Sequence, residues 1–188
     1  PRQPLAQSGD MGLCGRRIVD EERDLHRHLV ESRYTQHLPL DAVFTDDEGK
    51  TLALKDRLVE GKPTLLVLAY FRCPMLCGLV LSGMARGMRE SGLELGKDYQ
   101  AVAISFDPRE SSKLAAERQR GYTQSLGRPE AAAAWPFLTG EEPEIQKVTR
   151  ALGFRYAYDE KTKQYAHAAA LFVLGPDGML YVAVGNAG

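Results

Sequence analysis

Two uninterrupted apolar segments stand out in the pattern of hydrophobic and polar positions along the chain. Residues 64–71 read TLLVLAYF and residues 99–106 read YQAVAISF. A continuous apolar run of this length, without the every-second-position alternation of a half-exposed strand, is typical of a strand that is covered on both faces. Both segments therefore predict buried strands at the centre of a sheet.

Three other segments have the periodicity of a helix. In residues 75–92, apolar side chains recur at every fourth position, and residues 111–126 have an apolar and a charged face. Residues 141–153 repeat the pattern and end at a glycine, which is a common helix stop. We therefore expect helices after each buried strand and a third helix later in the chain.

Short strands complete the pattern. Residues 42–54 predict a hairpin around an acidic turn, residues 135–138 a short strand, and GPDG at 175–178 the turn of a closing hairpin. Strands that alternate with helices imply a mostly parallel central sheet with an antiparallel pair at one side. A strand that ends in a cysteine motif and opens a helix, followed by a closing hairpin, outlines an α/β, thioredoxin-like fold with a mixed sheet flanked by helices.

The amino-terminal region differs from the rest of the chain. In residues 16–33 the apolar positions are spaced almost as in a helix, within a highly charged remainder. We expect an arm or helix over residues 1–37 and one domain over residues 38–188. The chain begins with neither a methionine nor a charged-then-apolar export signal, which indicates a mature product or a fragment.

Composition excludes several classes of protein. With 44% hydrophobic residues the 188-residue chain can bury a substantial core. The net charge is −1 and the basic residues are spread along the chain, which argues against a nucleic-acid partner. The longest apolar run is far too short to span a bilayer. Three cysteines, an odd number, argue against a disulfide scaffold and suit a pair plus a bystander, Cys14.

Cys73 and Cys77 lie four positions apart where a buried strand gives way to a helix. On one helical turn their side chains would share a face, so the pair could bind a metal, form a disulfide or simply be buried in the core. Helix amides and the neighbouring Arg72 would make Cys73 the more thiolate-like, and Pro74 suits a first helical position. Two thiolates favour Cu(I) or zinc, but a third ligand is needed to hold the ion stably.

His167 is the best candidate for that third ligand. It lies at the start of a buried strand, and in a thioredoxin-like fold the loop before that strand approaches the cysteines. His26 and His28 are two positions apart, so on a helix they would point to different sides. His37 is expected to be exposed. A structural zinc site would need two more ligands at motif spacing, and Cys14 lies in an unrelated arm.

These segments together resemble the Sco/SenC family of copper-handling, thioredoxin-like proteins. The resemblance runs from about Leu38 to Gly185 and is carried by GKPTLLVLAYFRCPMLCG, AISFDPRES, FLTGEEPEIQKVTRALGFRYAYD and YAHAAALFVLGPDG. Cys-x3-Cys after a strand, with a distant histidine before a closing hairpin, is characteristic of this family. The family also keeps an Asp-Pro after the second core strand. We expect the matching Asp107 to cap the next helix or to shape the loop, and not to bind metal.

The resemblance implies that Cys73, Cys77 and His167 bind one copper ion, as Cu(I) or Cu(II). It implies a copper metallochaperone for the CuA centre in subunit II of cytochrome c oxidase, with another periplasmic copper chaperone as a further partner. The implied location is the periplasm, at the outer face of the bacterial cytoplasmic membrane, with the anchor absent from this chain. From the resemblance we also expect the carboxy-terminal helix of the family to be missing from the domain over residues 38–188.

The same cysteines leave an enzymatic alternative open. Cys73 would attack the disulfide of a partner protein and Cys77 would resolve the mixed disulfide, which makes the protein a thiol-disulfide oxidoreductase. That activity would not need His167 as a ligand. A peroxiredoxin-like peroxidase is set aside, because Pro63-Thr64 opens the strand itself and the Pro-x3-Thr-x2-Cys spacing fails.

Overall fold

The structure is a computed structural model, and it describes residues 37–73 and 76–186. All of these residues belong to one compact unit of the chain. The predicted arm at 1–37 lies outside the described residues apart from His37, and Cys14 and Pro74 lie outside them as well. The boundary between arm and domain therefore stays a prediction.

A mixed five-stranded sheet forms the centre, in the order β5-β4-β3-β8-β9. The strands are β3 (Thr64–Ala69), β4 (Gln100–Ser105), β5 (Phe137–Leu138), β8 (Ala169–Leu174) and β9 (Leu180–Asn186). β3 runs parallel to β4 and β4 to β5, whereas β8 runs antiparallel to both β3 and β9. The prediction of a mixed sheet is confirmed, because the two continuous apolar runs form the paired strands β3 and β4.

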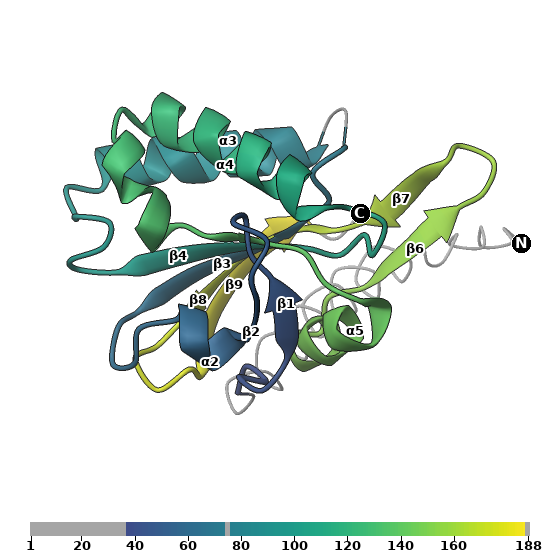
Figure 1. Cartoon of the computed structure of the whole chain (residues 1–188), viewed down its shortest axis with the longest axis horizontal. Helices are drawn as coiled ribbons and strands as arrows, with labels where there is room; N and C mark the ends of the chain where they lie inside the picture. Colours follow the sequence, from purple (N-terminus) through teal and green to yellow (C-terminus); the bar gives the residue numbers. More distant parts are fainter. Residues whose placement is uncertain (1–36, 74–75, 187–188) are drawn as a thin grey trace, which may run out of the picture. The chain divides into compact units, whose positions relative to one another are not determined.

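Helices cover both sides of this sheet (Figure 1). α3 (Leu76–Glu90) and α4 (Ser112–Leu126) lie next to each other on one side, and α5 (Glu142–Ala151) lies on the other. The ends of α4 follow from local chemistry: the Ser111 side chain accepts a hydrogen bond from the Leu114 N–H, and Gly127 ends the helix with a φ of 75°. The three predicted helices are therefore confirmed.

Smaller elements complete the fold. They are β1 (Val43–Thr45), β2 (Thr51–Ala53), α2 (Leu54–Arg57), the 3-10 helix η1 (Pro129–Ala134), β6 (Tyr156–Asp159) and β7 (Gln164–His167). β1 and β2 form the predicted acidic hairpin, in which Asp46 Oδ1 accepts from the N–H groups of Glu48 and Lys50. β6 and β7 form a second hairpin that extends away from the sheet in Figure 1. The sequence predicted strands here but not this separate pairing.

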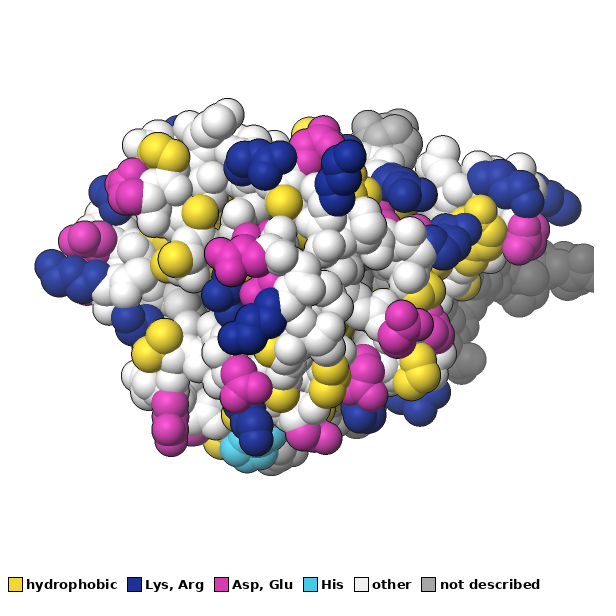
Figure 2. Space-filling view, viewed as in Figure 1, with side chains coloured by type: hydrophobic (Ala, Val, Ile, Leu, Met, Phe, Trp, Pro, Cys, Tyr) yellow, Lys and Arg dark blue, Asp and Glu magenta, His cyan; other side chains and the backbone are white. Residues whose placement is uncertain are grey.

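The surface carries charges of both signs. On the face shown in Figure 2, Lys and Arg side chains are interspersed with Asp and Glu. This mixture differs from the basic stripe of a nucleic-acid-binding protein. Within the described part of the chain, no helix has the length and apolar character needed to cross a membrane.

Candidate metal centre

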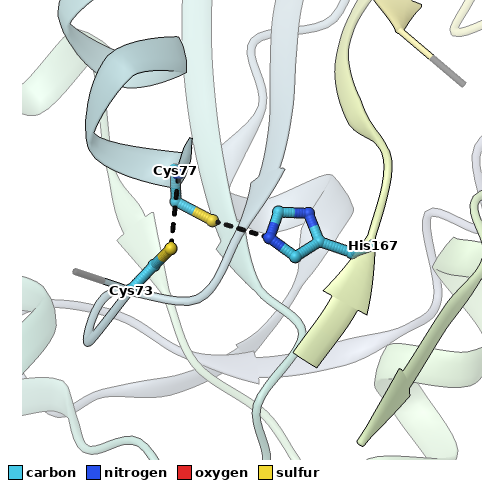
Figure 3. A group of neighbouring side chains, drawn as sticks. All are labelled: Cys73, Cys77 and His167. Carbon is cyan, nitrogen blue, oxygen red and sulfur yellow. Dashed lines mark hydrogen bonds between the residues drawn. The ribbon is translucent and has the colours of Figure 1, made fainter. Parts of the chain in front are cut away.

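The three side chains proposed as ligands meet at the carboxyl end of β3 (Figure 3). Cys73 follows β3, Cys77 lies in the first turn of α3, and His167 is the last residue of β7. The two sulfur atoms and one imidazole nitrogen all lie within 4.8 Å of one another. The fold thus brings together donors that are up to 94 positions apart in the sequence, each from a different segment.

Cys73 lies outside the helix, which differs from the expectation that both cysteines share its first turn. Its N–H donates to the Tyr70 carbonyl at 3.1 Å, so residues 70–73 form a turn that we call the Cys loop. Its Sγ accepts from the Cys77 N–H at 3.5 Å. The first amides of a helix lack partners within the helix, and here the sulfur supplies one. Cys73 therefore contacts the start of α3 through its sulfur, from the loop that precedes the helix.

His167 is held in one tautomer by its neighbour. Its Nδ1 lies 2.8 Å from the Ala168 carbonyl oxygen. Because a carbonyl can only accept, Nδ1 carries the proton and Nε2 has the lone pair. Nε2 faces the sulfur of Cys77 at 3.5 Å (Figure 3). This is the arrangement in which metal-binding histidines are generally oriented, with the second ring nitrogen donating to an acceptor.

Aromatic rings surround the imidazole of His167. The centroids of Tyr70, Phe106 and Phe154 lie 5.7, 5.1 and 6.4 Å from that of His167. All three residues are buried, Phe106 completely. Close packing of this kind restricts side-chain rotation. The rings therefore keep Nε2 directed at the cysteines.

The Cys77 thiol lies in a poorly solvated environment. Cys77 is 3% exposed, and Cys73 and Cys77 are not joined by a disulfide in this structure. Burial raises the pKa of Cys77 well above its usual range; a backbone hydrogen bond from Tyr70 opposes this, and the charge of a Cys73 thiolate adds to it. Burial also raises the pKa of Tyr70, whose hydroxyl interacts with Cys73. Metal binding at Cys77 therefore has to displace a proton.

Glu110 is a residue of this site that the sequence analysis missed. It is 7% exposed, and it accepts hydrogen bonds from the N–H groups of Phe71 and Arg72, both at 2.7 Å, and from the Ser105 hydroxyl at 2.6 Å. Burial raises the pKa of Glu110, and these hydrogen bonds partly offset the rise. In the sequence Glu110 is one acidic residue in a loop before a helix, and nothing marks it as buried.

Asp107 shapes the loop beside Glu110 and does not cap α4. Its two carboxylate oxygens accept from the Arg109 guanidinium at 2.8 and 2.9 Å, and the Tyr165 hydroxyl lies 3.3 Å from Oδ1. Although burial acts in the opposite direction, Arg109 keeps the pKa of Asp107 below its usual range. Because Ser111 caps the helix, the capping interpretation of Asp107 is wrong and the loop-shaping one is confirmed.

Comparison with known proteins gives a family and a fold. The family model described as SCO1/SenC matches residues 32–187. A candidate copper-binding protein of Stutzerimonas stutzeri is 26% identical over 125 residues, which make up 65% of this chain and 57% of the relative. The chain thus spans little more than half of the length of this curated relative.

Solved structures share the fold at low sequence identity. ScoI of Arabidopsis thaliana with copper bound is 24% identical with a TM-score of 0.61, covering 78% of this chain and 86% of that one. BsSco, a member of the Sco family of cytochrome c oxidase assembly proteins in which a disulfide switch was identified, is 16% identical with a TM-score of 0.57, covering 80% and 84%. These likenesses confirm the predicted thioredoxin-like architecture of the Sco proteins.

Proposed function

Because this chain belongs to the SCO1/SenC family, we propose that it is a copper metallochaperone that holds its cargo between Cys73, Cys77 and His167. The observation that carries the proposal is the convergence of two sulfurs and one imidazole nitrogen within 4.8 Å. The copper-binding relative and the copper-bound ScoI structure support the choice of metal. Two thiolates and an imidazole are a soft donor set that suits Cu(I).

The geometry fits a single ion. Bonds from Cys and His to a zinc-sized ion are about 2.0–2.3 Å long, so two donors that share one ion lie at most about 4.6 Å apart. The observed limit of 4.8 Å needs only a small inward movement of side chains. Among the described residues this is the one cluster of at least three such donors, and a structural zinc site would have four. An ion that is held by three donors is released more easily than one that is held by four, which suits a protein that passes its metal on.

Exposure suggests how the cargo is exchanged. Cys73 and His167 are half-buried, whereas Cys77 is buried. An incoming donor can therefore reach the ion beside Cys73 and His167 first, and Cys77 releases it last. A pocket of about 250 Å³ lined by Tyr70, Arg72 and residues of the β6–β7 hairpin opens next to the Cys loop, although none of the three proposed ligands lines it.

We propose the CuA domain of cytochrome c oxidase subunit II as the acceptor and another periplasmic copper chaperone as a donor. The support is the family membership and the description of BsSco as belonging to a family of oxidase assembly proteins. The exchange would take place in the periplasm, at the outer face of the bacterial cytoplasmic membrane. Copper would move by ligand exchange, with no change in its oxidation state.

The test is a Cu(I) titration of the reduced protein against a chromogenic chelator, with X-ray absorption to identify the ligands. We expect wild type to bind one Cu(I) through two sulfurs and at least one nitrogen. His167→Ala should weaken binding by more than about tenfold and remove the nitrogen contribution. His37→Ala is the matched control, because His37 is exposed and lies outside the cluster. Equal effects of the two substitutions would contradict the role of His167.

A thiol-disulfide oxidoreductase is the second candidate, favoured by the unequal burial of the two thiols. Half-buried Cys73 could attack a partner's disulfide and form a mixed disulfide, which buried Cys77 would then resolve. Cys73 and Cys77 would lose two electrons and two protons, and the partner's disulfide would gain them as two thiols. With a copper chelator present, reduction of a model disulfide no faster than the reductant-only background would count against this activity.

A further inference from the structure

The Glu110 carboxylate is surrounded by hydrogen-bond donors. Oε2 accepts from the Phe71 N–H at 2.7 Å and from the Ser105 hydroxyl at 2.6 Å, and Oε1 accepts from the Arg72 N–H at 2.7 Å. Glu110 itself is nine-tenths buried. These three contacts join the end of β4, the loop before α4 and the Cys loop.

The two amides belong to the residues that immediately precede Cys73. Phe71 and Arg72 form the middle of the turn that the Cys73 N–H closes on the Tyr70 carbonyl at 3.1 Å. When two successive N–H groups are directed at the two oxygens of one rigid carboxylate, the peptide planes between them are fixed. The Cα–Cβ direction of Cys73 follows from those planes, and with it the position of the sulfur.

A carboxylate is the side chain that this environment requires. Its two oxygens only accept, and all three neighbours donate. A glutamine of the same shape would place its NH2 group against an N–H in either orientation of the amide, that of Phe71 or that of Arg72. Hydrogen bonds to an ionised acceptor are also shorter and stronger than those between neutral groups, consistent with the distances of 2.6–2.7 Å.

We propose that Glu110 is a positioning residue of the metal centre, which orients the Cys loop so that Cys73 Sγ faces Cys77 and His167. Glu110 does not belong to the ligand cluster and acts through the backbone of Phe71 and Arg72. The inference rests on the proposed function, since it assigns Glu110 to the support of that site. Removing such outer contacts of a metal site typically weakens metal binding by about 10- to 100-fold.

The opposite end of the sheet provides a matched control. Gln100 is 5% exposed, and its side chain accepts from the Val59 N–H at 2.8 Å and donates to the Val59 carbonyl and to the Thr64 hydroxyl, both at 3.0 Å. Like Glu110, it is a buried polar side chain that holds a loop through the backbone and one hydroxyl. Its loop, however, is remote from Cys73. Gln100→Ala therefore reports what a general loss of loop anchoring does.

The experiment compares Cu(I) affinity, by chelator competition, in wild type, Glu110→Gln, Glu110→Ala and Gln100→Ala. We expect about 10- to 100-fold weaker binding in both Glu110 variants and less than threefold change in Gln100→Ala. In the metal-free protein, amide hydrogen exchange at Phe71 and Arg72 should accelerate in the Glu110 variants alone. Formation of the Cys73–Cys77 disulfide under a fixed glutathione ratio should change in the same variants.

Several results would overturn the assignment. Unchanged Cu(I) affinity and unchanged exchange in folded Glu110→Gln would do so, as would equal losses in Glu110→Ala and Gln100→Ala. If Glu110→Ala fails to fold, the isosteric Glu110→Gln decides. If wild type itself binds no Cu(I), the proposed function fails. The amide exchange and disulfide measurements then still decide whether Glu110 positions Cys73.

Discussion

The two ends of the β3–β4 strand pair are built alike but differ in one functional group. At the amino ends, the amide of Gln100 both accepts from and donates to the backbone of Val59. At the carboxyl ends, the carboxylate of Glu110 accepts from three donors and donates to none. An amide suits a loop that offers a donor and an acceptor, whereas a carboxylate suits a turn that presents only donors.

Gln100 therefore stabilises a loop of the fold, whereas Glu110 stabilises the loop that carries a residue of the candidate site. The candidate metal centre lies at the carboxyl ends, which is where open α/β sheets generally place their sites. In the part of the chain that the structure describes, no second cluster of three Cys, His, Asp or Glu donors occurs, at the amino ends or elsewhere. Burial alone therefore does not identify a functional polar residue. The distinguishing feature is whether the backbone segment that it hydrogen-bonds belongs to the candidate site.

The largest expected effect is that of Cys77→Ser. Serine replaces a soft sulfur donor by a hard oxygen, so Cu(I) affinity should fall by more than about 100-fold, beyond the range for outer contacts. Ala85→Ser is the matched control, because it places a hydroxyl at a buried position of the same helix, 3% exposed and outside the cluster. Chelator competition measures both. Similar losses in the two variants would mean that damage to α3, and not loss of a ligand, explains the result.

The next largest effect is expected for Gln100→Ala, at the opposite end of the strand pair from the candidate metal centre. Gln100→Ala leaves the Val59 N–H and carbonyl without their side-chain partner, so the free energy of unfolding should fall by about 1–3 kcal/mol. Urea unfolding monitored by circular dichroism measures the change. Copper affinity should stay within threefold of wild type. A tenfold loss of Cu(I) affinity in Gln100→Ala would show that the two ends of the sheet do not differ in their effect on the metal centre.

Much of the fold could be predicted because it depends on local patterns. The apolar runs at 64–71 and 99–106 have no exposed face, and a strand buried on both sides is their natural outcome. The end of α4 at Gly127 is equally local, whereas its cap was assigned to Asp107 and is Ser111. The β6–β7 hairpin was not separated from the later strands, because neither of its strands contains a buried residue like those of β3 and β4.

The three side chains of the candidate site could be picked out from the sequence, but the contacts that surround them could not. Cys73, Cys77 and His167 are recognisable by residue type and spacing, and the structure brings them together. The role of Glu110 depends on contacts 38 and 39 positions away, which no local pattern encodes. The tautomer of His167 likewise depends on the direction of the Ala168 carbonyl. The chemistry of the site could be inferred from residue types and their spacing, whereas the orientation of its side chains depends on long-range contacts in the fold.

The smallest expected effect concerns Asp107, the second carboxylate at the carboxyl ends. Its pKa is lowered in the folded protein, mainly by Arg109 and against the effect of burial. A lowered pKa stabilises the fold at pH values above the unfolded pKa of about 3.9, and this contribution is lost as the pH falls through the folded value. Since the Arg109 side chain is 52% exposed, the pair should contribute no more than about 1 kcal/mol.

Urea unfolding of wild type, Asp107→Asn and Arg109→Gln between pH 7 and pH 2.5 tests this sign. Both variants should be slightly less stable than wild type at pH 7, and the difference should shrink below pH 4 as Asp107 becomes protonated in the wild type. The charge of Asp107 also contributes to the raised pKa of Glu110, so Arg109→Gln, which keeps both carboxyl groups, is the cleaner of the two comparisons. A difference that grows on acidification would contradict a lowered pKa of Asp107 in the folded protein, and with it the stabilising role of the guanidinium.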